Sequence, residues 1–257
     1  MRHYLFLLAL LIPSLAMAET TQEKGLAIMK LQNDKNSGYK DYTATMIMTL
    51  KTAQGDSTVR NLRAAALEVK NDGDKSYMIF DKPADVRGTA ILTYSHVKDD
   101  DQWLYLPAVK RVKRLNSNNK SGPFMGSEFA YEDLSSPLVE KYSYNYLRQE
   151  ACGDMQCHVI ERKPLYENSG YTRQVMWIDT QELRTMKIDY YDRKNELLKT
   201  LTETGYKLYK NKFWRAETGT MVNHQTGKST ILVSKDFVFG KGLKNGDFEP
   251  DALQSMY

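Results

Sequence analysis

From Tyr39 almost to the end of the chain, apolar and polar residues alternate with a period of two in one segment after another. Alternate side chains of a strand point to opposite faces of a sheet, so each such segment predicts a strand with one apolar face. The first segment turns at "AQGD" into a second, "STVRNLRAAALEVK". In the first segment, the apolar even-numbered positions are Tyr42, Ala44, Met46, Met48 and Leu50, and they alternate with Thr43, Thr45, Ile47 and Thr49.

Further segments of strand type follow, separated by short turns such as "KNDGD", "ENSG" and "NHQTGK". They are "KSYMIF", "TAILTYSHV", "QWLYLP", "VEKYSYNYLR", "CHVIERKPL", "TRQVMWID", "LRTMKIDYYD", "ELLKTLTETGYKLY", "FWRAETGTMVN" and "STILVSKDFVF". About a dozen consecutive strands without intervening helices predict a mainly β fold with one highly curved antiparallel sheet. We expect the 17 tyrosines to lie on exposed or half-exposed strand faces.

One helix is expected before the first strand. The stretch "TTQEKGLAIMKLQ" begins with Thr20 and Glu23 at the spacing of a capping box, and it places Leu26, Met29 and Leu31 on one side. No shift in composition and no Pro-rich or Ser-rich linker divides the chain after it. A single domain is therefore predicted, residues 19–257.

The first residues have the composition of a secretory signal peptide. Arg2 supplies a positive charge, "YLFLLALLIPSL" is the apolar stretch, and "AMA" ending at Ala18 is typical of a cleavage site. We expect residues 1–18 to be removed and a soluble mature protein to begin at Glu19, without the cysteine of a lipid-anchored lipoprotein. The formal net charge of +4 is too small to indicate nucleic-acid binding.

The two cysteines, Cys152 and Cys157, stand in "EACGDMQCHV", with Gly153 and Asp154 between them as turn residues. In an exported protein this arrangement predicts a hairpin closed by a structural disulfide. The alternative is a redox-active pair, although the cysteines of such pairs are usually arranged as C-x-x-C.

The sequence offers few residues for catalysis or for binding a metal ion. The four histidines are far apart, so no metal site is expected, and no G-x-S-x-G motif supplies a nucleophile. Glu128, Glu132 and Asp133 could act as acid and base, but no partner group accompanies them, and we expect their carboxylates to face water. No catalytic residue and no cofactor is predicted.

The densest basic cluster is "KRVKRL", which contains Lys110, Arg111, Lys113 and Arg114. Two interpretations of this basic cluster remain open. It is either a solvated strand end or a docking point for anionic lipid headgroups or an acidic partner. Near an anionic membrane, each basic residue adds up to about 1 kcal/mol to binding.

The central block, residues 82–134, reads "KPADVRGTAILTYSHVKDDDQWLYLPAVKRVKRLNSNNKSGPFMGSEFAYEDL". It closely resembles the outer-membrane lipoprotein-sorting family of LolA-like periplasmic proteins, in the branch with the pattern "P…RG…L…D..WLYLPA.++V+RL…..FMGS-F.YED". More weakly, the resemblance extends across most of the mature chain, to the closing "GDFEPDAL". The matching residues are Pro83, Arg87, Gly88, Trp103, Leu104, Tyr105, Leu106, Pro107, Arg114, Gly126, Ser127, Phe129, Tyr131 and Asp133.

The resemblance implies a half-open antiparallel β-barrel whose hydrophobic hollow is covered by helices and a loop. It also implies a carrier without a cofactor, which moves lipid, lipoprotein acyl chains or another lipophile across the Gram-negative periplasm. Members of this branch often accompany inner-membrane transporters of the RND or MMPL type, so such a transporter is an expected partner, with transient membrane contact. Two alternatives are a non-transporting adaptor or regulatory subunit of such a transporter, and an enzyme that acts on a lipid.

Within this interpretation, residues 121–134, "SGPFMGSEFAYEDL", form a lid over the hollow; we call them the central segment. The alternative is that the central segment permanently plugs a closed core. Met46 and Met48 are expected to line the hollow because methionine adapts to ligands of irregular shape, although they would also fill a closed core. The predicted ligand-binding residues are Phe124, Met125, Phe129, Tyr131, Trp103, Tyr105, Met46 and Met48.

Overall fold

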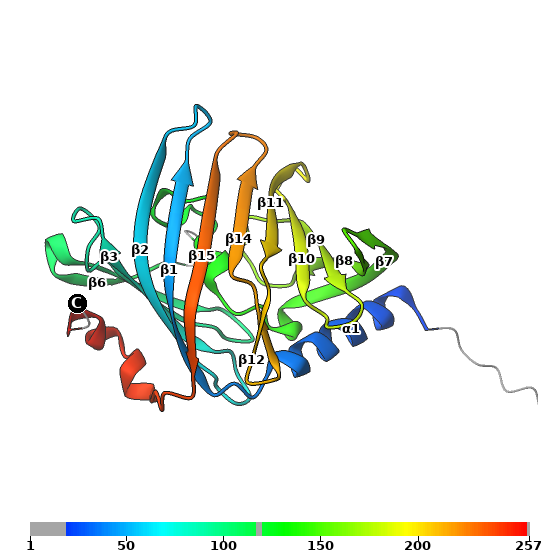
Figure 1. Cartoon of the computed structure of the whole chain (residues 1–257), viewed down its shortest axis with the longest axis horizontal. Helices are drawn as coiled ribbons and strands as arrows, with labels where there is room; N and C mark the ends of the chain where they lie inside the picture. Colours follow the sequence, from blue (N-terminus) through cyan, green and yellow to red (C-terminus); the bar gives the residue numbers. More distant parts are fainter. Residues whose placement is uncertain (1–18, 117–119, 256–257) are drawn as a thin grey trace, which may run out of the picture.

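A computed structural model describes residues 19–116 and 120–255, so the predicted signal peptide, residues 1–18, lies outside the described residues. Thirteen strands form one antiparallel sheet in the order β6-β5-β4-β3-β2-β1-β15-β14-β11-β10-β9-β8-β7. The sheet curves strongly without closing, and β6 and β7 are its edges (Figure 1). The prediction of a mainly β fold built on one curved antiparallel sheet is confirmed.

Neighbouring strands are mostly joined by short turns, while β12 and β13 form a small separate sheet. None of the helices in the described ranges is long and apolar enough to cross a membrane. The strands are β1 (Asp41–Lys51), β2 (Ser57–Leu67), β3 (Lys75–Lys82), β4 (Ala90–Tyr94), β5 (Asp101–Leu106), β6 (Arg111–Arg114), β7 (Tyr142–Cys152), β8 (Met155–Pro164), β9 (Arg173–Asp179), β10 (Thr185–Tyr191), β11 (Leu197–Thr204), β12 (Lys207–Tyr209), β13 (Phe213–Arg215), β14 (Thr218–Asn223) and β15 (Ser229–Phe239).

The α-helix α1 (Thr21–Asn36) precedes the sheet and packs against β7 (Figure 1). Its start is the predicted capping box. The backbone N–H of Glu23 donates to Thr20 Oγ1 at 3.2 Å, and the backbone N–H of Thr20 donates to Glu23 Oε2 at 2.9 Å. Two N–H groups at the helix start are thereby satisfied, which explains why the helix begins at this point.

The face of α1 that packs on the sheet consists of Gly25, Ile28 and Met29. Leu26 is 36% exposed and Leu31 is 57% exposed, so the prediction that both share the buried side with Met29 is wrong. Gly25 allows the close approach to β7, because a Cβ atom there would lie 3.0 Å from the backbone nitrogen of Tyr146. The buried side of α1 therefore combines a close backbone contact at Gly25 with the apolar side chains of Ile28 and Met29.

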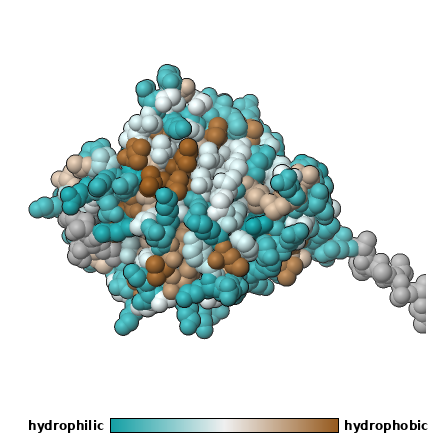
Figure 2. All heavy atoms as spheres, viewed as in Figure 1, coloured by the Kyte–Doolittle hydropathy of each residue, from teal (hydrophilic) through white to brown (hydrophobic). Residues whose placement is uncertain are grey.

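The two faces of the sheet follow the predicted alternation. In β1, Ala44 and Met48 are buried on the interior face, whereas Thr45 and Ile47 are exposed on the outer face. An apolar strip crosses the outer face over β2, β1 and β15 (Figure 2). Its residues are Val59, Ile47, Ile231 and Val233.

Three apolar clusters are distributed over the two faces of the sheet. The first cluster lies under α1 on the interior face of β7 to β11 and includes Ile28, Met29, Phe129, Tyr144, Ile160, Met176, Ile188, Tyr190 and Leu201. The second lies on the interior face of β1 to β5 and consists of Met48, Leu62, Phe80, Val86, Ile91, Leu104 and Phe124. The third lies on the opposite face of β2 to β5, where η6 (Asn245–Phe248) and η7 (Pro250–Ser255) cover it, and consists of Ala65, Ile79, Ala90, Leu92, Tyr105, Phe248 and Leu253.

Four tyrosines depart from the expected exposure. Tyr105 is 1% exposed, Tyr190 is 4% exposed, and Tyr144 and Tyr171 are each 5% exposed. The expectation of exposed or half-exposed tyrosines is therefore wrong for these four. A buried tyrosine needs a hydrogen-bond partner for its hydroxyl. Tyr144 donates to the carbonyl of Val139 at 3.1 Å, and Tyr171 donates to a carboxylate of the central segment.

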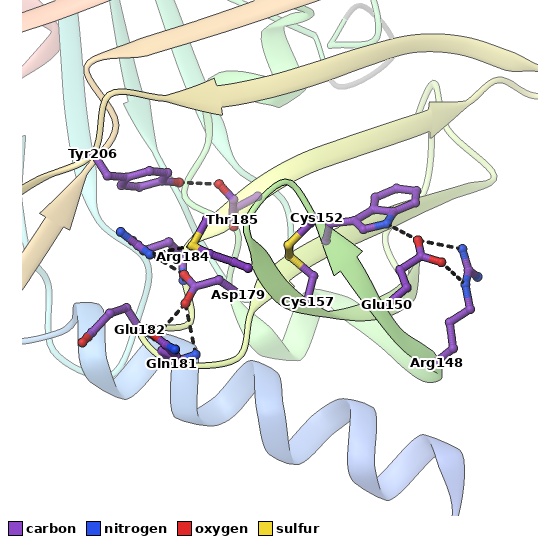
Figure 3. The surroundings of a disulfide bond; sticks show 12 residues. Arg148, Glu150, Cys152, Cys157, Asp179, Gln181, Glu182, Arg184, Thr185 and Tyr206 are labelled. Atoms are coloured by element: carbon purple, nitrogen blue, oxygen red, sulfur yellow. Dashed lines mark hydrogen bonds and ion pairs between the residues drawn. A yellow bond between two sulfur atoms is a disulfide. The ribbon is translucent and has the colours of Figure 1, made fainter.

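The tip of the β7–β8 hairpin is closed by the predicted disulfide, Cys152–Cys157 (Figure 3). Beside it, Trp177 Nε1 of β9 donates to Glu150 Oε1 of β7 at 2.6 Å, and Arg148 Nε donates to Glu150 Oε2 at 2.7 Å. The disulfide and these side-chain bonds together connect β7, β8 and β9 at this end of the sheet.

Replacing both Cys152 and Cys157 by alanine is expected to lower the free energy of unfolding by about 2 kcal/mol, because the bond closes only a short loop in the unfolded chain. Urea titration of both proteins measures the difference. Adding dithiothreitol should destabilise the wild type by the same amount. If dithiothreitol also destabilised the cysteine-free variant by about this amount, the stabilisation could not be assigned to the disulfide.

The turn after β9 is organised by Asp179 (Figure 3). Its carboxylate accepts from the backbone N–H of Glu182 at 2.7 Å, and from the backbone N–H and Nε of Arg184 at 2.8 Å each. Gln32 of α1 then donates to the carbonyl of Leu183 at 2.7 Å. The turn is thereby fixed against α1, next to the space between helix and sheet.

Candidate functional site

A cavity of about 1050 Å³ lies between α1, the interior face of β8 to β11 and the stretch of residues 132–140. Its volume is at the upper end of the roughly 300–1000 Å³ that is usual for sites that bind small molecules. Tyr39 and Tyr42 at the start of β1 extend the wall on the other side. The apolar part of the wall includes Met29, Leu134, Leu138, Val139, Met176, Ile188 and Leu201.

A row of buried polar side chains crosses the interior face of the sheet at the cavity. The register places each member opposite the next on neighbouring strands, from β8 to β14: Arg162, Gln174, Tyr190, Lys199 and Asn223. The first three of these line the cavity. Sequence reasoning missed this polar row because its members stand singly in five separate strand segments, and only the pairing of the strands brings them together.

The central segment docks on the polar row through its carboxylates. Asp133 Oδ2 lies 2.6 Å from Lys199 Nζ, and the two side chains are only 5% and 4% exposed. Asn223 Nδ2 donates to Glu128 Oε2 at 2.7 Å. The expectation that Asp133 and Glu128 face water is therefore wrong, since both carboxylates bind protein groups.

The aromatic side chains of the central segment lie in the apolar clusters. Phe124 is fully buried in the second cluster, with its ring centroid 5.6 Å from that of Tyr131. Phe129 is 8% exposed and belongs to the first cluster. Met125 is half-buried, and its carbonyl accepts from Arg60 Nη1 at 2.6 Å. This placement matches the alternative in which the segment fills the core.

None of the eight residues predicted to bind ligand lines the cavity. Met46 and Met48 contact the second cluster from β1. Trp103 and Tyr105 belong to the third cluster, beneath the C-terminal residues. The reason is strand alternation: Leu104 of β5 points to the interior, so its two neighbours point to the opposite face.

Three carboxyl groups that line the cavity each accept a hydrogen bond from a tyrosine hydroxyl. The pairs are Tyr39 with Asp74 at 2.7 Å, Tyr166 with Glu132 at 3.1 Å and Tyr206 with Glu203 at 2.6 Å. Burial raises the pKa of each of these carboxyls above its ordinary value. The expectation that Glu132 faces water is thus also wrong. The high tyrosine content was the one sequence signal that pointed to such pairs.

The raised pKa of Glu203 predicts a particular pH dependence of stability. Burial is the main cause of the raised pKa. The carboxyl group of Glu203 therefore binds its proton more tightly in the folded chain than in the unfolded chain, where its ordinary pKa is 4.5. Its stabilising contribution is present below that ordinary pKa and is lost as the pH rises through the folded pKa. The difference in unfolding free energy, wild type minus Glu203→Gln, should therefore fall as the pH rises above about 4.5.

Urea titrations at a series of pH values from about 4.5 upward measure that difference. A difference that does not change with pH would contradict the assignment to Glu203.

The basic cluster lies at the β6 edge of the sheet, and none of its members lines the cavity. Its four side chains are exposed: Lys110, Arg111, Lys113 and Arg114. Arg114 forms an ion pair with Asp101 of β5. Basic side chains discourage an edge strand from pairing with another chain, and these also present positive charge outward.

The groups around the cavity are suited to binding. They combine apolar side chains with tyrosine hydroxyls, carboxyl groups that are already hydrogen-bonded, and the guanidinium of Arg162. Among the residues that the structure describes, no group of three or more His, Cys, Asp or Glu side chains could hold a metal ion.

An open, strongly curved antiparallel sheet that forms one wall of a large cavity, with a helix across it, is an incomplete β-barrel. A solved domain of an outer membrane lipoprotein-sorting protein from Vibrio parahaemolyticus is similar over 91% of this chain and 99% of its own, with 53% identity and a TM-score of 0.89. The chain belongs to this outer membrane lipoprotein-sorting, LolA-like family.

Other comparisons agree with this assignment. A DUF1329 family protein from Desulfovibrio piger is 26% identical, with a TM-score of 0.87 over 91% of this chain and 100% of its own. A LolA superfamily protein from Nitrosomonas europaea, 20% identical with a TM-score of 0.72 over 91% of this chain and 100% of its own, has the same fold. A family profile described as "Uncharacterized protein" matches residues 72–255. Comparison with curated proteins gives no match.

Proposed function

We propose that the protein is a periplasmic carrier that holds lipid or lipoprotein acyl chains in the cavity under α1. The observation that carries the proposal is a cavity of about 1050 Å³ in a LolA-like open sheet. A C16 chain taken out of a bilayer exposes about fifteen methylenes at about 0.8 kcal/mol each, on the order of 12 kcal/mol. Only an enclosed apolar surface can offset such a cost.

The cavity wall offers such a surface. Met29 of α1 and Met176 of β9 face it from opposite sides, and unbranched methionine side chains adapt to ligands of irregular shape. Ile188 and Leu201 continue the apolar wall on β10 and β11. Three carboxyl groups of the wall, those of Asp74, Glu132 and Glu203, accept hydrogen bonds from tyrosine hydroxyls, which reduces the cost of placing an apolar chain beside them.

Added bulk on the cavity wall should weaken binding. Met29→Trp adds bulk at a residue of α1 that lines the cavity, so it should weaken binding of the neutral fluorescent probe N-phenylnaphthylamine by about tenfold or more. Leu31→Trp, on the exposed side of the same helix, is the matched control and should bind like the wild type. Fluorescence titration measures both.

The native cargo is sought by extracting protein purified from the periplasm with organic solvent and analysing the extract by mass spectrometry. The proposal expects a lipophile in the extract. If none co-purifies and the wild type does not bind N-phenylnaphthylamine, the carrier function is excluded.

The basic cluster at β6 is the proposed contact with an anionic membrane or with an inner-membrane transporter of the RND or MMPL type, from which cargo would be received. Reversing the charges of Lys110, Arg111 and Lys113 to glutamate should remove up to about 1 kcal/mol of membrane binding per residue. Sedimentation with phosphatidylglycerol vesicles measures this loss. Because the cluster lies outside the cavity lining, probe binding should persist.

The exposed basic edge also favours the second candidate function, a non-transporting adaptor of such a transporter. The two candidate functions differ in whether the cavity binds a ligand. An adaptor would lose partner binding on charge reversal but would bind the probe no better in the wild type than in Met29→Trp.

A further inference from the structure

Arg162 differs from the other buried cations of the described chain. Lys141 lies 2.6 Å from Asp100, and Lys199 lies 2.6 Å from Asp133, so each of these lysines has a buried carboxylate partner. Arg162 is only 5% exposed, yet no carboxylate in the described ranges forms an ion pair with it. Arginine keeps its charge under all ordinary conditions, and a buried charge without a counter-charge is strongly destabilising.

The contacts that Arg162 does make hold its guanidinium in place without neutralising it. Its Nε donates to Gln174 Oε1 at 2.7 Å, and its Cζ lies 4.3 Å from the ring centroid of Tyr142. Stacking on a ring uses the face of the guanidinium and leaves the N–H donors in its plane free. Nη1 is buried and has no hydrogen-bond partner.

The next polar groups around Arg162 are tyrosine hydroxyls. Tyr190 lies two strands away in the same polar row and also lines the cavity. Its hydroxyl makes no hydrogen bond to another residue in the described part of the chain. Burial raises the pKa of this hydroxyl well above its ordinary value, so it stays protonated and able to donate.

An apolar row runs parallel to the polar row, displaced from it by two residues on each strand. Its members are again in register, from β8 to β14: Ile160, Met176, Ile188, Leu201 and Met221. A separation of two residues on a strand is about 7 Å. The cavity wall therefore presents an unneutralised guanidinium and a hydroxyl donor directly beside a continuous apolar surface.

We propose that Arg162 and Tyr190 bind the anionic head group, carboxylate or phosphate, of a lipophile whose chain lies along the apolar row. This inference rests on the proposed carrier function and names the chemical class of its cargo. A guanidinium presents its N–H donors in a planar fork that matches both anions, and the hydrogen bonds are charge-assisted. The bound anion supplies the counter-charge that the chain itself does not supply.

The test is displacement of N-phenylnaphthylamine by palmitate, hexadecyl phosphate and hexadecanol, three ligands with the same chain length. For the wild type, at least one of the two anions should bind about tenfold or more tightly than the alcohol. The anion that binds more tightly identifies the preferred head group. Arg162→Met should lose this preference while hexadecanol affinity changes less than about twofold.

Two further variants separate charge from structure. Arg162→Lys should recover part of the preference for the anion because it keeps the charge. Lys35→Met is the matched control, since Lys35 lines the same cavity but is exposed and paired with Glu182, and it should keep the preference. The melting temperature of empty Arg162→Met should be equal to or higher than that of the wild type, because an uncompensated buried charge has been removed.

Three results would overturn the inference. Equal affinity of the wild type for all three ligands would leave the carrier function standing and remove the anion preference. A parallel loss of palmitate and hexadecanol affinity in a stably folded Arg162→Met would make Arg162 a structural residue. If none of the ligands binds the wild type, the carrier function fails together with this inference.

Discussion

Phe124→Ala is expected to lower the free energy of unfolding by about 3–5 kcal/mol and to leave probe binding by the cavity nearly unchanged. The ring is fully buried in the second cluster, with its centroid 5.7 Å from that of Phe80, and it is not part of the cavity lining. Its removal leaves a void that the surrounding side chains fill only in part. Urea titration and fluorescence titration of the same preparation measure the two effects.

The control for this prediction is Leu165→Ala, which removes an apolar side chain that is 65% exposed and should change stability by less than about 0.5 kcal/mol. The two outcomes for Phe124→Ala separate the two interpretations of the central segment. A large loss of stability with intact binding identifies a plug of the core. A large loss of binding with little loss of stability would identify a lid and contradict the prediction.

Asp133→Asn is expected to cost about 3–5 kcal/mol of stability because it leaves the buried ammonium of Lys199 without its counter-charge. The same carboxylate also accepts from the hydroxyl of Tyr171 at 2.9 Å and from the backbone N–H of Ala130 at 2.7 Å. This one side chain therefore joins the central segment to β11 and to the residues before β9. Urea titration measures the loss.

A double variant distinguishes the lost ion pair from other damage. Adding Lys199→Met to Asp133→Asn should recover much of the stability, since an apolar replacement no longer needs a charge partner. The exposed pair of Lys207 and Glu217 provides the control: Lys207→Gln should cost less than about 1 kcal/mol. Equal effects of Asp133→Asn and Lys207→Gln would contradict the importance of the buried pair.

The parts of the structure that sequence predicts well are local. The alternation in β1 assigns Ala44 and Met48 to one face because the period of a strand is fixed by its backbone. The capping box of α1 and the disulfide of the β7–β8 hairpin each join residues only a few positions apart. Such features depend on neighbouring residues and need no knowledge of how the strands pair.

The position of the cavity could not be predicted in the same way. Trp103 and Tyr105 look like lining residues in the sequence, but the face of β5 that they occupy is covered by the C-terminal residues, which lie more than a hundred positions later. Phe124 could equally cover a hollow or fill a core, and the difference depends on how β1 to β5 pack against it. Sequence supplies the two faces of each strand but does not say what covers each face.

The polar row also could not be predicted from the sequence. Arg162, Gln174 and Tyr190 are each unremarked within their own strand segments, and only the registers of β8, β9 and β10 join them beside the cavity. The three Tyr–carboxyl pairs of the wall also join residues from different elements or turns. Resemblance to a family predicted the open sheet and the class of protein, while the chemical groups of this cavity had to be found in the structure.

The most direct test of the central claim, that cargo lies in the cavity under α1, is photo-crosslinking with a palmitate analogue that carries a diazirine near the end of its chain. Peptide mass spectrometry of the irradiated protein locates the adducts. We expect adducts on α1, on residues 132–140 and on the interior face of β9 to β11, and we expect unlabelled palmitate to compete them away. Adducts concentrated at Phe124, Met46 and Met48, or no adducts that palmitate competes away, would contradict the central claim.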